Sequence, residues 1–211
     1  MTAVTGLVDA VSYLGLGRIF TANMTGNVVI MAFAAAKTPG LSILRSVVAL
    51  ILFLSGAVAG GCLANTLQTK ARRTWVTTTT GLESSLLFIA ALVAYADSSA
   101  PLRDVVLYSI IVLTAFAMGL RNSTIRRLAI RELTTTVLTL TLAGLAADSS
   151  LAGGTNPNWR RRGGSVIMLF LGALAGALLL RQSLFYALLA PALITGLCTL
   201  LLYLHLAPAK S

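Results

Sequence analysis

The sequence contains apolar blocks that are too long for the core of a water-soluble domain. They cover residues 47–63, 82–96, 105–120, 166–180 and 184–206. A membrane-spanning helix needs about 20 mostly apolar residues, and several blocks reach this length with their flanks. In addition, only 10% of the residues are charged, whereas a soluble domain has roughly 25%. The sequence therefore predicts a polytopic membrane protein, because it has too little polar surface to face water.

The net charge of +10 comes from basic residues that lie between the apolar blocks. The clusters are Lys70-Ala71-Arg72-Arg73, Arg126-Arg127 and Arg160-Arg161-Arg162. Such clusters set the orientation of membrane proteins, because basic loops stay on the cytoplasmic side. We therefore expect the lipid bilayer as a partner and no nucleic acid.

Few residues in the chain suit catalysis or metal binding. Cys62 and Cys198 lie inside apolar blocks, where they are expected to pack as small hydrophobic residues, and His205 is the single histidine. Zinc-protease and serine-hydrolase motifs are absent, as are clustered carboxylates. We expect no enzyme activity, no metal site and no cofactor.

An internal repeat divides the chain. Gly6-Leu7-Val8-Asp9-Ala10 aligns with Gly119-Leu120-Arg121-Asn122-Ser123, and the stretch 53–60 resembles 170–176. We interpret the chain as two membrane repeats, residues 1–98 and 99–211, that together form one membrane domain. Each repeat has four helical segments. The first segment has sixteen residues before Gly119 but only five before Gly6, so we expect the N-terminal helix to be truncated.

Basic residues favour three crossings in each repeat. Segments 21–36 and 134–147 are short and polar at their starts. If they enter the membrane and return, the sixteen basic residues divide eleven to five between the two sides, whereas full crossing gives nine to seven. The predicted fold is therefore an all-α transmembrane bundle of about six spans. It consists of two inverted three-span repeats, each with a short re-entrant or broken helix, which is an architecture found in secondary transporters.

Polar residues at membrane depth mark the candidate site. An ionisable group there costs at least ~2.5–3.5 kcal/mol and usually faces an interior, so we expect Asp9 to face the bundle interior. The candidates for a substrate path are Asp9, Asn23, Thr25, Gly26, Asn27, Asn122, Thr134, Thr135, Thr136 and Thr139. The alternative is that Asn and Thr only hydrogen-bond neighbouring helices. Arg121 and Arg131 are candidates for binding an anion, although a topology role at the inner edge is favoured, and Glu83 is expected near the membrane surface.

The stretch from Gly6 to Asn27, with Thr21-Ala22-Asn23-Met24-Thr25-Gly26-Asn27 at its end, resembles the signature of the YoaK-like family. The second-half stretch from Gly119 to Thr139 is similar to that family too. The family consists of bacterial membrane proteins with a domain of unknown function. The resemblance implies a membrane location and about six spans, and it implies no substrate. Family members have a longer N-terminal apolar helix, which agrees with the truncation expected from the repeat.

Two functions follow from these observations. The first is a small secondary transporter of the bacterial plasma (inner) membrane, with cytoplasmic basic loops and a small molecule or ion as substrate. Asp9 would be its proton- or cation-responsive group, and a homodimer would enlarge so thin a bundle. The alternative is a non-transporting membrane scaffold or regulatory protein.

Overall fold

The computed structural model describes residues 1–67, 72–97, 102–128 and 138–205. All regular structure in these ranges is helical, which confirms the predicted all-α class. The long helices are α3 (Ile43–Thr66), α4 (Arg72–Ala96), α5 (Asp104–Arg127), α7 (Trp159–Leu180) and α8 (Leu184–His205). The shorter ones are α1 (Thr2–Gly15), α2 (Met24–Ala35), α6 (Leu138–Ala147) and the 3-10 turn η2 (Ser150–Ala152).

Five of these helices are long and apolar enough to cross a membrane, namely α3, α4, α5, α7 and α8. They correspond to five of the six spans expected from the sequence. The remaining expected span is α1, which has 14 residues. At 1.5 Å per residue its length is about 21 Å, less than the hydrocarbon core of a bilayer, which is about 30 Å thick.

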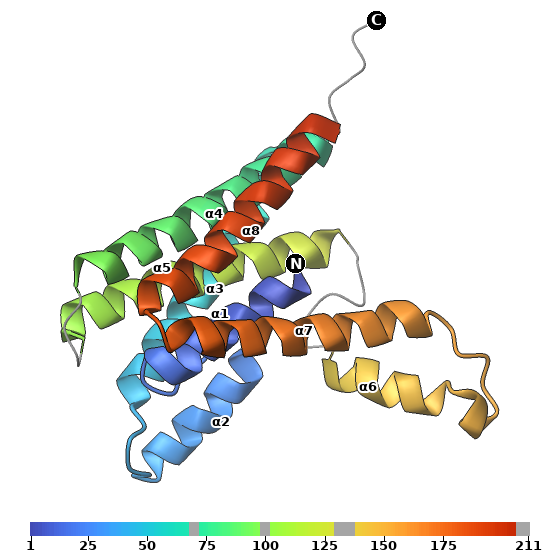
Figure 1. Ribbon diagram of the computed structural model, residues 1–211, viewed down its shortest axis with the longest axis horizontal. Helices are drawn as coiled ribbons and strands as arrows, with labels where there is room; N and C mark the ends of the chain where they lie inside the picture. Colours follow the sequence, from blue (N-terminus) through green and yellow to red (C-terminus); the bar gives the residue numbers. More distant parts are fainter. Residues whose placement is uncertain (68–71, 98–101, 129–137, 206–211) are drawn as a thin grey trace, which may run out of the picture.

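The helices pack in pairs (Figure 1). Helix α3 packs on α5, α1 packs on α7, and α4 packs on both α8 and α5. Among the five long helices, α5 is the most buried. Of the residues in its apolar 18-residue stretch, 56% are buried, compared with 17% for α7. Helix α5 contacts α3, α4 and α1, so a polar group on α5 has the best chance of lying in the interior.

Two short helices follow polar segments and lie at the side of long ones. Helix α2 has 12 residues and packs on α3, and α6 has 10 residues and packs on α7. At about 18 Å and 15 Å, neither is long enough to cross a bilayer. Asn23 caps α2, because its side-chain oxygen accepts a hydrogen bond from the Gly26 amide at 3.2 Å. The helix start expected near residues 21–27 is confirmed.

Glycines bring α1 and α7 into backbone contact, and they do the same for α3 and α5. Gly6 lies directly against the carbonyl oxygen of Leu169, and Gly119 lies against that of Phe53. On the opposite helices, Gly172 faces the backbone of Ala3 and Gly56 faces that of Phe116. A Cβ atom at any of these positions would collide with backbone, so small residues fix the separation of both helix pairs.

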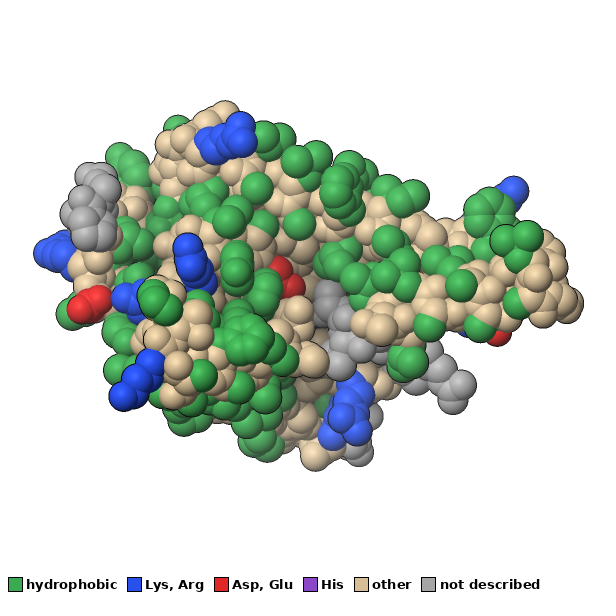
Figure 2. All heavy atoms as spheres, turned by 90° about the horizontal axis from the view of Figure 1, so that it is seen from below, with side chains coloured by type: hydrophobic (Ala, Val, Ile, Leu, Met, Phe, Trp, Pro, Cys, Tyr) green, Lys and Arg blue, Asp and Glu red, His purple; other side chains and the backbone are tan. Residues whose placement is uncertain are grey.

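The outer surface of the bundle is apolar. Large hydrophobic side chains are exposed on every long helix, including Ile51, Phe88, Val105, Phe170 and Leu193. Figure 2 shows hydrophobic side chains over most of one face, with basic side chains in separate groups. In water such a surface would promote association, whereas in a bilayer it matches the lipid chains. The protein is therefore a multi-pass membrane protein.

Candidate functional site

Asp9 lies on α1 and holds the start of α2. One oxygen of its carboxylate accepts hydrogen bonds from the backbone amides of Ala22 and Asn23, at 3.3 and 3.2 Å. These amides precede α2 and have no partner within the helix. The Asp9 side chain is half-buried. A carboxylate at this place therefore satisfies two free backbone donors and offsets the positive end of the helix dipole.

Further polar contacts join α1 to the segment before α2. The Ser12 hydroxyl donates to the carbonyl oxygen of Asp9 at 3.1 Å and accepts from the Thr21 amide at 3.3 Å. The side-chain oxygen of Asn27, which is 1% exposed, accepts from the Phe20 amide at 3.2 Å. We call Asp9, Ser12, Asn23 and Asn27 the junction cluster, because they tie an irregular backbone to α1.

A fully buried ion pair lies between α4 and α5. Nη2 of Arg121 is 2.8 Å from Oε1 of Glu83, and the two side chains are only 3% and 1% exposed. Glu83 is eleven positions from the first residue of α4, which places it about 16 Å along a span of 25 residues. Both ionisable groups are thus inside helices long and apolar enough to cross a membrane, where such groups are rare and often functional.

The rest of the Arg121 guanidinium has weak partners. Its Nη1 donates to the Thr5 hydroxyl at 3.4 Å and lies 4.0 Å from the sulfur of Met118. Its Nη2 also lies 3.1 Å from the sulfur of Met1. Its Nε is buried without an acceptor among the residues that the structure describes. Among these contacts only Glu83 supplies a charged oxygen acceptor.

A polar stripe on α1 connects the two groups of residues. Thr2, Thr5, Asp9 and Ser12 are three, four and three positions apart, so they lie on one face of the helix. Thr5 contacts Arg121, whereas Asp9 and Ser12 contact the segment before α2. Thr5 and Asp9 are about 6 Å apart along the helix axis. The ion pair and the junction cluster are therefore neighbours along one line of polar side chains.

Comparison with known proteins places the chain in a family. The model of a family described as "Protein of unknown function (DUF1275)" matches residues 1–201. The chain belongs to the DUF1275 family. It is also 33% identical over 145 residues to the UPF0700 transmembrane protein YoaK of Bacillus subtilis, which confirms the resemblance seen in the sequence. The matched region covers 69% of this chain and 62% of YoaK, so the chain spans less than two thirds of that relative. No solved structure matches.

The other candidate residues of this DUF1275 protein are less well connected. Thr25 is exposed on α2, and Gly26 packs against the ring of Phe20. Asn122 is half-buried and donates to the carbonyl oxygen of Met118 at 2.9 Å, within its own helix. Thr139 is exposed on the first turn of α6. The structure therefore gathers Asp9, Asn23 and Asn27, and it does not bring Asn122 or Thr139 to them.

Part of the predicted site lies outside the described residues. These positions are Arg131, Thr134, Thr135 and Thr136, which precede α6. Helix α6 itself is tied to α7, because Nη1 of Arg162 contacts a carboxylate oxygen of Asp148 at 2.6 Å. The junction cluster is thus described for the first half of the DUF1275 chain, and its expected counterpart in the second half stays a prediction.

Glu83 and Arg121 differ from what the sequence suggested. Glu83 was expected near the membrane surface and Arg121 at the inner edge, but the structure buries both and pairs them. One feature of the sequence does indicate that Glu83 lies below the membrane surface. It follows the basic residues at 70–73 by about three helical turns. No sequence signal identified the pair, since it depends on which faces of α4 and α5 meet.

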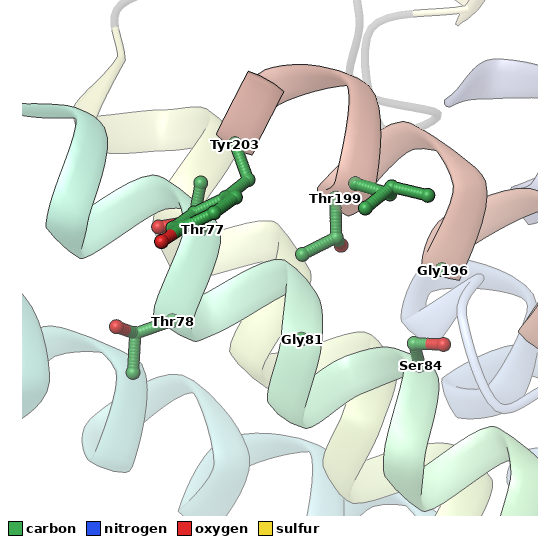
Figure 3. Close-up of a pocket in the computed structure, with 8 residues that line it drawn as sticks. Thr77, Thr78, Gly81, Ser84, Gly196, Thr199 and Tyr203 are labelled. Atoms are coloured by element: carbon green, nitrogen blue, oxygen red, sulfur yellow. The ribbon is translucent and has the colours of Figure 1, made fainter. Parts of the chain in front are cut away.

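A shallow groove runs along the seam of α4 and α8 (Figure 3). One part has a volume of about 490 Å³ and is lined by Thr77, Thr78, Gly81, Ser84, Gly196, Thr199, Leu200 and Tyr203. A second part of about 510 Å³ shares Ser84, Gly196 and Leu200 with it and continues over apolar side chains. None of the sequence-predicted site residues lines this groove, so it is separate from the polar stripe of α1.

Proposed function

We propose that this protein is a small secondary transporter of the bacterial plasma membrane, with a solute path along α1 between the junction cluster and the Glu83–Arg121 pair. The observation that carries the proposal is the ion pair itself. Burying two charges is costly, and a buried pair is often no more stabilising than apolar residues of the same volume. A transport path explains why a thin bundle keeps such a pair inside its spans.

The stripe on α1 supports the same path. Thr2, Thr5 and Ser12 are buried, at 9%, 5% and 1% exposure, and Asp9 continues the line between them. Buried hydroxyls with a carboxylate on one helical face offer successive hydrogen-bonding positions to a solute or a proton. The irregular backbone before α2 fits this role, because such backbone occurs at membrane depth where it lines protein interior or a cavity.

We further propose that the fold is an inverted repeat of six spans, 1–98 and 99–211. The glycine contacts support this interpretation. Gly6 and Gly119 are 113 positions apart, and their contact residues Phe53 and Leu169 are 116 apart. The reciprocal contacts keep the same shifts, since Phe116 and Ala3 differ by 113 and Gly172 and Gly56 differ by 116. Equivalent atoms thus meet in the two halves, as a two-fold repeat requires.

In this arrangement α2 and α6 are short helices that enter the membrane and return. Their lengths of 12 and 10 residues support this, as does their packing on α3 and α7, which are equivalent in the repeat. The count of basic residues then gives cytoplasmic loops that carry eleven of the sixteen. Inverted repeats with interrupted helices are the recurrent design of transporters that alternate access to a central site.

The second candidate is a non-transporting scaffold or regulatory protein. The Asp9 contacts favour it, because the carboxylate oxygen that accepts from Ala22 and Asn23 acts as a structural cap. The glycine contacts also have a purely structural reading as close helix packing. A scaffold predicts stable co-purification with another protein and no effect of small solutes on thermal stability.

A flux assay separates the two candidates. Purified protein is reconstituted in liposomes, and uptake is measured for a panel of organic acids, amino acids, sugars and inorganic ions. A transporter moves at least one solute faster than empty liposomes do, and Arg121→Gln abolishes this flux. Arg181→Gln is the matched control, because Arg181 is exposed at the end of α7. Uptake equal to that of empty liposomes for the whole panel would reject transport.

A further inference from the structure

We propose that Arg121 binds a small planar oxyanion, such as a carboxylate or nitrate, which replaces Glu83 as the partner of the guanidinium, and that Glu83 takes up one proton in the same step. This inference rests on the proposed transport function and names the substrate class of that site. The juxtaposition that carries it is an incompletely bonded guanidinium next to a carboxylate, both buried within the spans.

The guanidinium has unused donors in the plane that an oxyanion requires. Arginine carries five N–H donors in a rigid fork. Here Nη2 lies 2.8 Å from Oε1 of Glu83 without the alignment of a hydrogen bond, and Nη1 donates to the Thr5 hydroxyl at 3.4 Å. The remaining described contacts are with the sulfurs of Met1 and Met118, which are weak acceptors, and Nε has no described acceptor. A planar oxyanion offers two parallel oxygens and would fill this fork bidentately.

The Glu83 carboxylate is held in a way that permits exchange. Oε1 of Glu83 lies 2.8 Å from Nη2 of Arg121, yet this buried oxygen accepts no hydrogen bond within the described residues. The groups that face the carboxylate are Arg121 on α5, the amino group of Met1 beside α1 and the Thr195 hydroxyl on α8. The Thr195 hydroxyl donates to the carbonyl oxygen of Pro191 at 2.8 Å, so towards Glu83 it can act as an acceptor, which suits the protonated form.

Charge balance favours the proton. If an anion paired with Arg121 while Glu83 stayed ionised, binding would add one negative charge to the buried site, and only the amino group of Met1 could offset it. When Glu83 takes up a proton, the ion pair is replaced by a new ion pair and a neutral acid. The net charge of the site is then the same before and after binding, whatever the state of the Met1 amino group. One proton therefore enters with one anion, and the exchange is electroneutral.

The planar fork selects the class of ligand. Chloride is spherical and would engage the fork at one point, whereas nitrate and carboxylates match two N–H groups. An amino-acid zwitterion would place its ammonium group on an ionised Glu83 and would bind without a proton. The shape of the anion therefore distinguishes planar oxyanions from chloride. The number of protons taken up on binding distinguishes them from amino-acid zwitterions.

The test is equilibrium binding of sodium nitrate to the whole chain in detergent. Binding is measured by the rise in thermal stability and by calorimetry. Nitrate is the primary probe because it does not titrate in the working range, and acetate and chloride are compared with it. The apparent dissociation constant should rise about tenfold per pH unit wherever Glu83 is ionised in the free protein, because one proton binds with each anion. Chloride should bind at least about tenfold more weakly.

Two variants sharpen the test. Glu83→Gln removes the titrating group but keeps an acceptor for Arg121, so it should bind nitrate more tightly and with no pH dependence. Arg121→Lys keeps the charge and the pairing with Glu83, so it should fold, but it lacks the planar fork and should lose the preference for nitrate over chloride. Saturable nitrate binding that is independent of pH in the wild type would overturn the proposal, and so would equal nitrate binding by Arg121→Lys.

These experiments can reject the oxyanion site and the transport function separately. Nitrate binding with the expected pH slope, in a protein that moves no solute in liposomes, would support the oxyanion site and reject transport. Solute uptake that needs Arg121, in a protein that shows no oxyanion binding, would support transport and reject the oxyanion site.

Discussion

Removing Glu83 or Arg121 singly should destabilise the protein more than removing both. The change is a cycle of three variants, Glu83→Met, Arg121→Met and the double variant. Because the two side chains are 1% and 3% exposed and 2.8 Å apart, each single variant leaves a charge buried without its partner. Breaking such a pair costs roughly 3–5 kcal/mol of unfolding free energy, whereas replacing both members with apolar residues is often neutral.

The two single variants should differ from each other. Arg121 cannot lose its proton, so Glu83→Met leaves a permanent charge and should show the full loss. Glu83 can take up a proton when Arg121 is absent, so the loss in Arg121→Met should shrink as the pH falls. The ion pair of Arg45 and Asp104 is a matched control, because it spans 3.9 Å and its side chains are 29% and 82% exposed. An exposed pair contributes only about 0.2–1 kcal/mol.

The assay is reversible unfolding in mixed micelles with increasing SDS, followed by the fluorescence of Trp75 and Trp159. The coupling energy of the cycle is the loss in the double variant minus the sum of the two single losses. A coupling energy smaller in magnitude than about 1 kcal/mol, equal to that of the Arg45–Asp104 control, would contradict the burial of this pair. It would also remove the main argument for a charged site inside the bundle.

Two further predictions use the same unfolding assay. Gly119→Val should cost about 1–3 kcal/mol by forcing α3 and α5 apart, whereas Gly61→Val, which has open space around it, should change stability by less than about 0.5 kcal/mol; equal effects would argue against the close contact. Asp9→Leu should cost about 1–3 kcal/mol, because two amides before α2 lose their acceptor. Asp9→Asn keeps an oxygen acceptor and should cost clearly less, so equal losses in the two Asp9 variants would show that the capping account is wrong.

The extent of the helices could be predicted from the sequence because apolar length and caps are local properties. The expected segment 43–68 is α3, Ile43–Thr66, and the expected segment 184–206 is α8, Leu184–His205. The start of α2 followed from Asn23, a residue that caps free amides wherever the chain turns into a helix. Each of these features depends on a few neighbouring residues, so the sequence carries them directly.

The pairing of charges could not be predicted, because it depends on the relative rotation of two helices. Arg121 and Glu83 are 38 positions apart, and although Arg121 lies in the repeated stretch Gly119–Ser123, no motif links it to Glu83. Helical periodicity shows which residues share a face, but it does not show that this face of α5 meets α4. The contact between Gly119 and Phe53 fixes how α5 sits on α3, and it is seen only when the backbones are placed together.

The role of Asp9 was predicted in part. Its polarity at membrane depth indicated an inward-facing residue, and the structure finds it half-buried with its oxygen on α2. The capping of the Ala22 and Asn23 amides was not foreseen, since it requires the chain to fold back after Gly17, which has a positive φ of 86°. Glycine tolerates this conformation, and a turn there brings residues 13 and 14 positions apart into contact.

We propose that the polar stripe of α1 is part of a path that opens to each side of the membrane. It is tested most directly by Thr5→Cys in a background with Cys62→Ser and Cys198→Ser, since Thr5 is only 5% exposed and contacts Arg121. A membrane-impermeant thiol reagent is added to oriented vesicles from one side or the other, with Ser150→Cys as an exposed control that should react from one side only. A transporter predicts that Thr5→Cys reacts from both sides, because the path opens alternately. A Thr5→Cys side chain that reacts from neither side, in vesicles where the control reacts fully, would contradict the account.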